Sequence, residues 1–83
     1  MLAQYLDLAL EMARYEIIGR NHAYWGEIPG LKGVWAQDET LTGCQRKLRE
    51  ALGDWVGLRM RLGLDIPEVG GLNLNHMGLT VQT

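Results

Sequence analysis

The chain contains, from Tyr24 to Leu62, the stretch that decides its fold: YWGEIPGLKGVWAQDETLTGCQRKLREALGDWVGLRMRL. The second half of this stretch repeats apolar residues at spacings of three and four, as one side of a helix requires. These residues are Leu41, Cys44, Leu48, Ala51, Trp55, Leu58 and Leu62. We therefore predict one long helix over residues 40–62, which buries this apolar stripe against the segment that precedes it.

Both ends of the predicted helix carry capping residues. Thr40 is a candidate N-cap, because its hydroxyl can accept a hydrogen bond from a backbone N–H of the first turn. Thr42 is an alternative cap, since Gln45 follows three residues later as in a capping box. Gly63 suits the left-handed conformation that commonly ends a helix.

Residues 14–37 predict three short antiparallel strands. Apolar and polar residues alternate with period two along them, and residues of the turn-forming types separate them. Asn21-His22 supplies the first turn, so we interpret His22 as a turn residue, and Pro29 stops the second strand before a glycine-bracketed turn. The predicted strands are 14–20, 24–28 and 34–37.

The pairing across the second hairpin decides where its two tryptophans lie. If Ile28 pairs near Val34, Gly26 faces Ala36 on one side of the sheet. Trp35 then lies beside Glu27, and Trp25 lies diagonal to Trp35 on the other side. The small side chains leave room for the long helix, so the aromatic face is expected on the opposite side.

An exposed pair of tryptophans is typical of an interface. We therefore take Trp25, Glu27 and Trp35 as a candidate partner or subunit interface. Two alternatives stay open: the N-terminal helix folds over the tryptophans and covers them, or the face holds a small ligand.

The remaining segments complete a single domain spanning residues 1–83. Residues 1–13 repeat apolar side chains at helical spacing without a glycine or proline, which predicts an N-terminal helix. Residues 64–83 form a tail without Lys or Arg, in which Leu72 and Leu74 alternate with asparagines and favour a short fourth strand. The predicted class is α+β: a three- to four-stranded antiparallel sheet with one long helix packed on one face, preceded by an extra helix.

A chain of 83 residues is small for a stable core and usually needs reinforcement. Its single cysteine forbids an internal disulfide, and His22 and His76 are too far apart in sequence to suggest a zinc site. With a disulfide and a zinc site excluded, we expect association of subunits, as a dimer or a tetramer, to reinforce the fold. Cys44 lies on the apolar stripe, so we interpret it as a core residue and not as a nucleophile.

The charge distribution is uneven. Residues 40–62 hold five basic and two acidic residues, a local charge of +3. Since the net charge of the chain is −2, the remaining residues together carry −5. An ordinary solvated helix face explains this pattern, and a functional basic face is the alternative. The residues of that candidate basic face are Arg46, Lys47, Arg49, Arg59 and Arg61.

The first residues include Asp7 and Glu11 and lack the basic start of a secretory signal. No apolar run approaches the roughly 20 residues of a membrane span. We expect a cytoplasmic protein without a membrane segment.

The same residues resemble the N-terminal domain of HicB-like antitoxins of prokaryotes. The likeness rests on the tyrosine strand, the Pro-x-Leu-x-Gly turn at Pro29–Gly33, the short strand after it, Thr40-Leu41 opening a helix, and Arg49-Glu50-Ala51-Leu52. It covers residues 14 to about 75. The resemblance implies a partial RNase-H-like fold of β-β-β-α-β type that pairs with a small HicA-type ribonuclease toxin and assembles as dimers or larger.

The chain departs from that family pattern in three places. Fewer than twenty-five residues follow the helix and none is basic, so DNA binding by this chain alone is not expected. Gly43 stands where the family favours a helix former and weakens the first turn by about 0.5–1 kcal/mol. An N-terminal helix precedes the first strand, where many relatives begin with the strand itself.

No catalytic, cofactor or metal residues are predicted. The acidic residues Glu16, Glu27, Asp38 and Asp54 are scattered and do not predict the paired-metal site of a true RNase H. The predicted function is a non-enzymatic antitoxin-type protein that binds and neutralises a HicA-type toxin. The alternatives are a self-assembling orphan without a toxin, or a weak nucleic-acid-binding module that uses the basic face.

Overall fold

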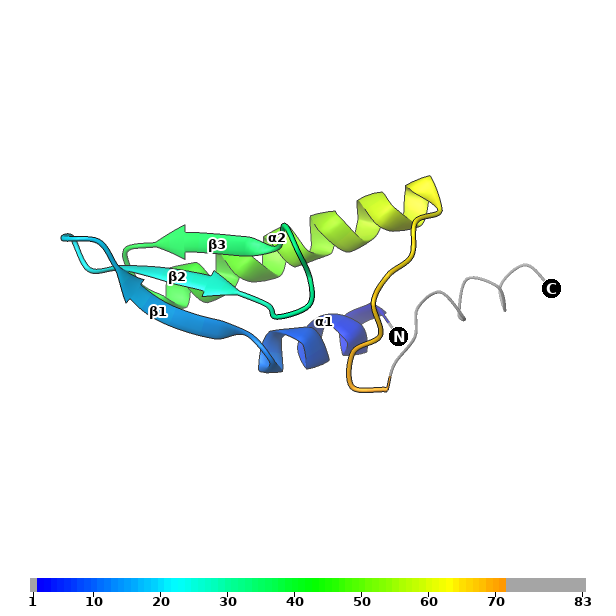
Figure 1. Ribbon diagram of the computed structural model, residues 1–83, viewed down its shortest axis with the longest axis horizontal. Helices are drawn as coiled ribbons and strands as arrows, with labels where there is room; N and C mark the ends of the chain where they lie inside the picture. The colour runs from blue at the N-terminus through cyan, green and yellow to red at the C-terminus, as the bar shows by residue number, and fades with distance from the viewer. Residues whose placement is uncertain (1, 72–83) are drawn as a thin grey trace.

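The computed structural model describes residues 2–71 of the chain (Figure 1). These residues confirm the predicted α+β class: an N-terminal helix, three antiparallel strands and one long helix. The strand predicted around Leu72–Asn75 lies outside the described residues. The elements are α1 (Leu2–Glu11), β1 (Arg14–Ile18), β2 (Ala23–Glu27), β3 (Trp35–Asp38) and α2 (Leu41–Leu62).

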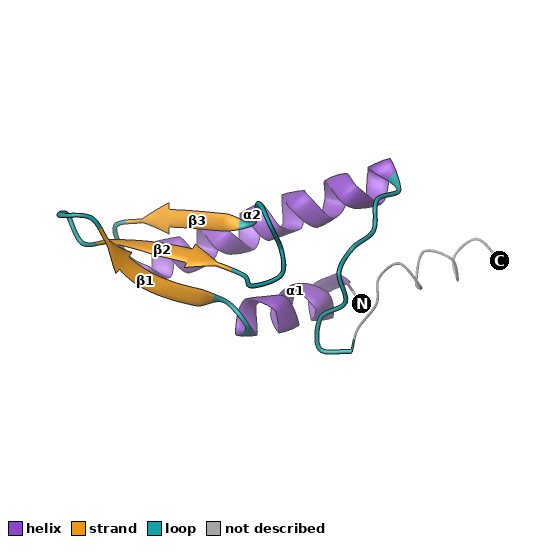
Figure 2. Ribbon diagram, in the orientation of Figure 1, coloured by secondary structure: helices purple, strands orange, loops and turns teal. Residues whose placement is uncertain are grey.

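The three strands form an antiparallel sheet in the order β1-β2-β3, and α2 packs along one of its faces (Figure 2). The predicted register is confirmed, because Gly26 pairs with Ala36 and Glu27 pairs with Trp35. Strand boundaries differ slightly from the prediction. β1 ends at Ile18, since Gly19 at φ 72° already belongs to the turn, which also holds His22 at φ 54°.

The core lies between the sheet, α2 and α1. All three layers contribute fully or almost fully buried side chains. Along α2 the buried residues recur every fourth position, a spacing that follows one line along a helix. The principal core residues are Tyr5, Ala9, Ile28, Leu31, Val34, Ala36, Cys44, Leu48, Leu52, Val56, Ile66 and Val69.

The predicted buried stripe of α2 is correct at Cys44 and Leu48 and wrong at three of its leucines. Leu41, Leu58 and Leu62 are 40%, 47% and 61% exposed, whereas Leu52 and Val56, which the predicted stripe omits, are buried. The 22-residue helix is about 33 Å long, while strands of four or five residues span only about 13–17 Å. The far end of α2 therefore extends past the sheet, and what lies beneath it there is α1 and the segment after Gly63.

The segment that follows α2 returns to the core and is not a loose tail. Ile66 and Val69 are buried, and the hydroxyl of Tyr5 donates a hydrogen bond of 2.6 Å to the Pro67 carbonyl. Tyr5 is itself fully buried, and this burial raises the pKa of its hydroxyl above the ordinary value. The contact joins α1 to a segment 62 residues later.

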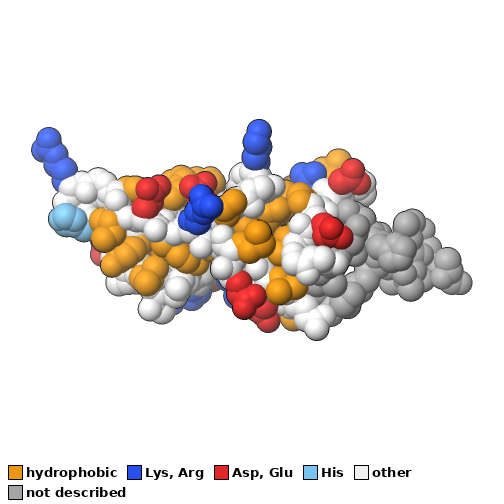
Figure 3. Space-filling view, turned by 60° about the horizontal axis from the view of Figure 1, so that its bottom comes forward, with side chains coloured by type: hydrophobic (Ala, Val, Ile, Leu, Met, Phe, Trp, Pro, Cys, Tyr) orange, Lys and Arg blue, Asp and Glu red, His pale blue; other side chains and the backbone are white. Residues whose placement is uncertain are grey.

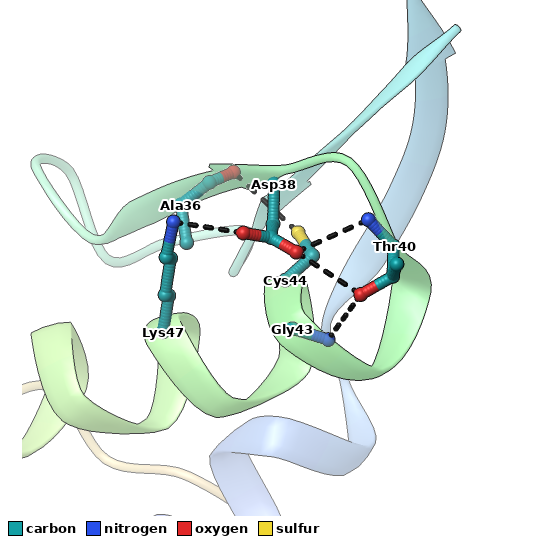
Figure 4. A network of polar contacts seen from close by, with 6 residues as sticks. All are labelled: Ala36, Asp38, Thr40, Gly43, Cys44 and Lys47. Carbon is teal, nitrogen blue, oxygen red and sulfur yellow. Dashed lines mark hydrogen bonds and ion pairs between the residues drawn. The ribbon is translucent and has the colours of Figure 1, made fainter.

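The start of α2 is held by a network of polar contacts centred on Asp38 (Figure 4). The backbone N–H and the hydroxyl of Thr40 donate to one Asp38 carboxylate oxygen at 3.1 and 3.0 Å. Thr40 is the N-cap, as predicted, and its hydroxyl accepts from the Gly43 N–H at 3.0 Å. Lys47 reaches the other Asp38 oxygen from the next turn, at 2.8 Å.

Gly43 is required by this network. A Cβ at position 43 would overlap the Asp38 carboxylate and would lie 2.9 Å from the Thr40 hydroxyl oxygen. Glycine is a poor helix former, but here it lets an aspartate side chain reach the first turn of α2. Gly43 has a low helix propensity, but it leaves the space in which Asp38 and Thr40 cap the helix.

We predict that Gly43→Ala lowers the free energy of unfolding by about 1 kcal/mol, because loss of the cap outweighs the gain in helix propensity. Gly53→Ala is the matched control, since a Cβ there meets nothing within 4 Å. That control should raise the free energy of unfolding by about 0.5–1 kcal/mol. Urea denaturation of both variants measures the two effects, and a stabilised Gly43→Ala protein would contradict the account.

Asp38 also predicts an acid dependence of stability. The Lys47 ammonium and the two Thr40 donors lower the pKa of its carboxyl from 3.8 to about 2. Since the folded pKa lies below the ordinary value, the stabilisation is fully present above about pH 4 and is lost as the pH falls toward 2. Denaturation midpoints measured across this range should fall more steeply for the wild type than for Asp38→Asn.

Candidate protein-interaction surface

The sheet face opposite α2, which no helix within residues 2–71 covers, carries two stacked tryptophans. The rings of Trp25 in β2 and Trp35 in β3 have centroids 4.7 Å apart and planes inclined by 7°. Trp35 is 51% exposed and Trp25 is half-buried. The diagonal placement predicted from the hairpin register is thus confirmed.

The opposite face has no room for large side chains. A Cβ on Gly26 would lie 2.7 Å from a ring carbon of Tyr15 and 3.1 Å from the sulfur of Cys44. Ala36, the partner of Gly26 in β3, is buried, and its carbonyl accepts from the Cys44 thiol at 3.6 Å. Because successive residues of a strand point to opposite faces, the tryptophans on either side of these small residues must face outward.

Charged and polar residues surround the tryptophan pair. Arg14, Glu27 and Trp35 form one row across the three strands. Glu16, Trp25 and Gln37 form the next row on the same face. A hollow of about 280 Å³ lies beside the rings, between them and the Pro29–Gly33 turn. An aromatic centre with a polar rim is the composition of a protein interface.

The N-terminal helix does not cover this face. α1 packs against α2, and its buried residues Tyr5 and Ala9 belong to the core on the helix side of the sheet. Of the alternatives that the sequence left open, coverage of the tryptophans by the first helix is therefore wrong. The interface role of Trp25, Glu27 and Trp35 stays a prediction.

The candidate basic residues do not gather on one side of α2. Lys47 pairs with Asp38, and Arg49 pairs with Asp7 of α1 at 2.9 Å. Arg46 and Arg61 form no side-chain hydrogen bond or ion pair within residues 2–71. A nucleic-acid role for the basic set stays a prediction.

Arg59 is engaged as well. It lies 4.7 Å above the Trp55 ring and donates to the Asp65 carbonyl at 2.6 Å. The Arg59 side chain thus covers one face of the ring of Trp55, the third tryptophan, which lies on the same helix. Trp55 therefore offers less ring surface for stacking than Trp35 does.

His22 and Cys44, which the sequence also singled out, lie in a turn and in the core. His22 lies in the β1–β2 turn, and Cys44 is fully buried beneath the sheet, where burial raises the pKa of its thiol. Residues 2–71 hold no cluster of three His, Cys, Asp or Glu side chains able to bind a metal ion. In the same range, no helix has the length and apolar character needed to cross a bilayer.

One hollow has no counterpart among the sequence predictions. A volume of about 730 Å³ lies between α1, Arg49 of α2 and the Gly70-Gly71 turn. It results from the return of residues 64–71 toward α1, a contact for which the local sequence carries no periodic signal. Among residues 2–71, Gly71 is the last one that lines it.

Residues 2–71 form a small α+β domain with an aromatic sheet face on the side opposite α2. Residues 4–67 match the family described as UPF0150-like. The chain belongs to the UPF0150-like family.

A solved structure is similar to this chain in both sequence and fold. The chain is similar to the protein TTHA0281 from Thermus thermophilus, as seen in its crystal structure, with 40% sequence identity and a TM-score of 0.81. The alignment covers 87% of this chain and 89% of that one. No curated protein matches the sequence significantly.

The tryptophan stack predicts a spectroscopic signature. Two parallel indoles at 4.7 Å should couple and give an exciton couplet in the far-ultraviolet circular dichroism spectrum. Trp35→Phe should abolish the couplet, whereas Trp55→Phe, the control on α2, should leave it in place. A wild-type spectrum without a couplet would contradict the stacking in solution, and a couplet that survives Trp35→Phe would show that it arises from other chromophores.

Proposed function

We propose that this protein is a non-enzymatic, HicB-like antitoxin-type protein that binds and neutralises a HicA-type ribonuclease toxin. The UPF0150-like family is associated with HicB-like antitoxin-type proteins. The observation that carries the proposal is the uncovered sheet face with its stacked Trp25–Trp35 pair. Aromatic anchors at the centre of a polar rim supply most of the binding energy in many protein interfaces.

Electrostatics favour a basic partner. The chain outside residues 40–62 carries a net charge of −5. Two of the acidic groups outside that range, Asp38 and Asp7, pair with Lys47 and Arg49. Setting both pairs aside leaves −3 outside residues 40–62 and +1 within them, so the unpaired charge is still acidic. An RNA-cleaving toxin needs basic residues for its own substrate, so an acidic binding protein would steer it and occupy that surface.

Nucleic-acid binding by this chain is the weaker candidate. Three of its five basic candidates are engaged within the fold, through Asp38, Asp7 and the Asp65 carbonyl. The exposed ring pair is on the opposite side of the sheet from α2, so aromatic and basic groups do not form the joint platform that single-strand binding uses.

Co-expression with the candidate toxin tests the proposal. The candidate toxin to look for is a short basic protein encoded by a gene next to this one, and its expression should arrest growth. Wild-type protein should restore growth, and Trp25→Ala/Trp35→Ala should fail to restore it because truncation of two interface anchors weakens binding at least about 10-fold. Met60→Ala, which alters an exposed apolar residue at the far end of α2, is the control and should rescue fully.

Binding measured by calorimetry with purified proteins separates recognition from expression level. Full rescue by the double tryptophan variant would refute the role of this face. A neighbouring toxin that the wild type neither binds nor neutralises would refute the antitoxin function itself.

A further inference from the structure

An acidic side chain stands beside the exposed tryptophan of the sheet. Glu27 is the cross-strand partner of Trp35 in the β2–β3 ladder, so the two side chains lie next to each other on the same face. Glu27 is exposed, and within residues 2–71 its carboxylate forms no ion pair or hydrogen bond. In this part of the chain the carboxylate is therefore not used by the fold.

The stacking of the two tryptophans leaves ring surface on Trp35. The parallel rings of Trp25 and Trp35 cover one face of each other, yet Trp35 keeps 51% of its surface exposed. The hollow of about 280 Å³ is lined by both rings, by Glu27 and by the Pro29–Gly33 turn. Pockets for drug-sized ligands measure roughly 300–1,000 Å³. The hollow therefore suits a single long side chain better than a small molecule.

The molecule contains an example of the contact that this hollow can make. On α2, the guanidinium carbon of Arg59 lies 4.7 Å from the centroid of the Trp55 ring. A guanidinium over an indole is attracted by the negative potential of the ring face, and its planar shape allows it to stack. Trp35 offers the same ring with a carboxylate beside it, and a carboxylate can accept two parallel hydrogen bonds from a guanidinium.

We propose that the hollow between Trp25, Trp35 and Glu27 binds an arginine side chain of a basic protein partner. The guanidinium stacks on the Trp35 ring and donates hydrogen bonds to the Glu27 carboxylate. The identity of the partner as a ribonuclease toxin rests on the proposed function, whereas the arginine site is argued from the sheet face itself. Because an RNA-cleaving protein uses basic groups to hold its substrate, an arginine bound in this hollow is withdrawn from RNA.

The geometry favours arginine over lysine. As cross-strand partners, Trp35 and Glu27 have Cβ atoms about 4.5–5.5 Å apart, so one group can contact both side chains. A guanidinium can stack through its face and donate through its edge at the same time. An ammonium is a compact and strongly hydrated charge that cannot stack on a ring.

Two basic residues of this chain lie near the site. Arg14 is the partner of Glu27 in β1, on the side away from Trp35, and forms no ion pair with it. Lys32 lines the hollow from the turn and is exposed. Figure 3 shows acidic and basic side chains among hydrophobic ones over the sheet half of the molecule. Lys32 competes with the arginine of the partner, so loss of Lys32 and loss of Glu27 should change the affinity in opposite directions.

A small guanidinium ion tests the site without a toxin. Ethylguanidinium chloride, titrated into the full ¹⁵N-labelled chain, should shift the indole N–H signal of Trp35 in NMR spectra with a Kd on the order of 100 mM. Ethylammonium chloride at the same ionic strength should shift this signal much less. Trp55 is the internal control, since Arg59 already covers one face of its ring. Glu27→Gln should reduce the shift at Trp35.

Calorimetry with the candidate toxin tests the site in recognition. Glu27→Gln should weaken binding roughly 5- to 30-fold, and Lys32→Gln should strengthen it about 2- to 5-fold. Glu50→Gln makes the same chemical change as Glu27→Gln on the exposed side of α2 and should leave the affinity unchanged.

Substitutions in the toxin identify the bound side chain. Replacement of one toxin arginine by lysine should weaken binding to the wild-type chain, because the charge is kept and the stacking is lost. The same replacement should cause little further loss in binding to Glu27→Gln, since both changes remove one shared contact.

The outcomes separate this inference from the proposed function. A toxin that binds the wild type and Glu27→Gln equally well would overturn the arginine site and leave the antitoxin function in place. A chain that binds ethylguanidinium at Trp35 but binds no toxin would support the site and refute the antitoxin function. No shift at Trp35 with ethylguanidinium, or an equal shift with ethylammonium, would overturn the site.

Discussion

The close approach of α2 to the middle of the sheet is the constraint on which the rest of this structure depends. Gly26 and Ala36 face each other across β2 and β3, and the sulfur of Cys44 sits directly against them. Any larger residue at position 26 would meet the Tyr15 ring and this sulfur. With one face reserved for small residues, the period-two alternation of the strands leaves the other face to Trp25 and Trp35. The candidate binding surface is thus a consequence of how the core packs.

The polar network at the start of α2 fixes the direction in which the helix leaves the sheet. Asp38 ends β3 and at the same time accepts hydrogen bonds from Thr40, the cap of α2. Lys47 adds a second attachment one turn later. The glycine at position 43, which helix propensity alone marks as unfavourable, is explained by the space that the Asp38 carboxylate needs. Glycine is unfavourable in the first turn of a helix, and the hydrogen bonds between Asp38 and Thr40 compensate for it here.

Short-range features of this fold follow from the sequence, and long-range ones do not. The hairpin register, the Thr40 cap and the Gly63 C-cap at φ 69° each depend on residues close together in the chain. The docking of α1 against α2 and the return of Ile66 and Val69 to the core depend on contacts between distant segments. The apolar pattern of α2 is compatible with two adjacent stripes. Only the limited length of the sheet, together with α1 and residues 64–71, decides that Leu52 and Val56 are buried while Leu58 and Leu62 are not.

The hydrogen bond from Tyr5 to Pro67 bears on the order in which the molecule can assemble. Its two partners are separated by 62 residues, so the first helix cannot reach its final place until most of the chain has been synthesised. The hairpin and the beginning of α2 involve only neighbouring residues and can form earlier. During translation the apolar side of α1 therefore stays without its cover until residues 66–69 have been added to the chain.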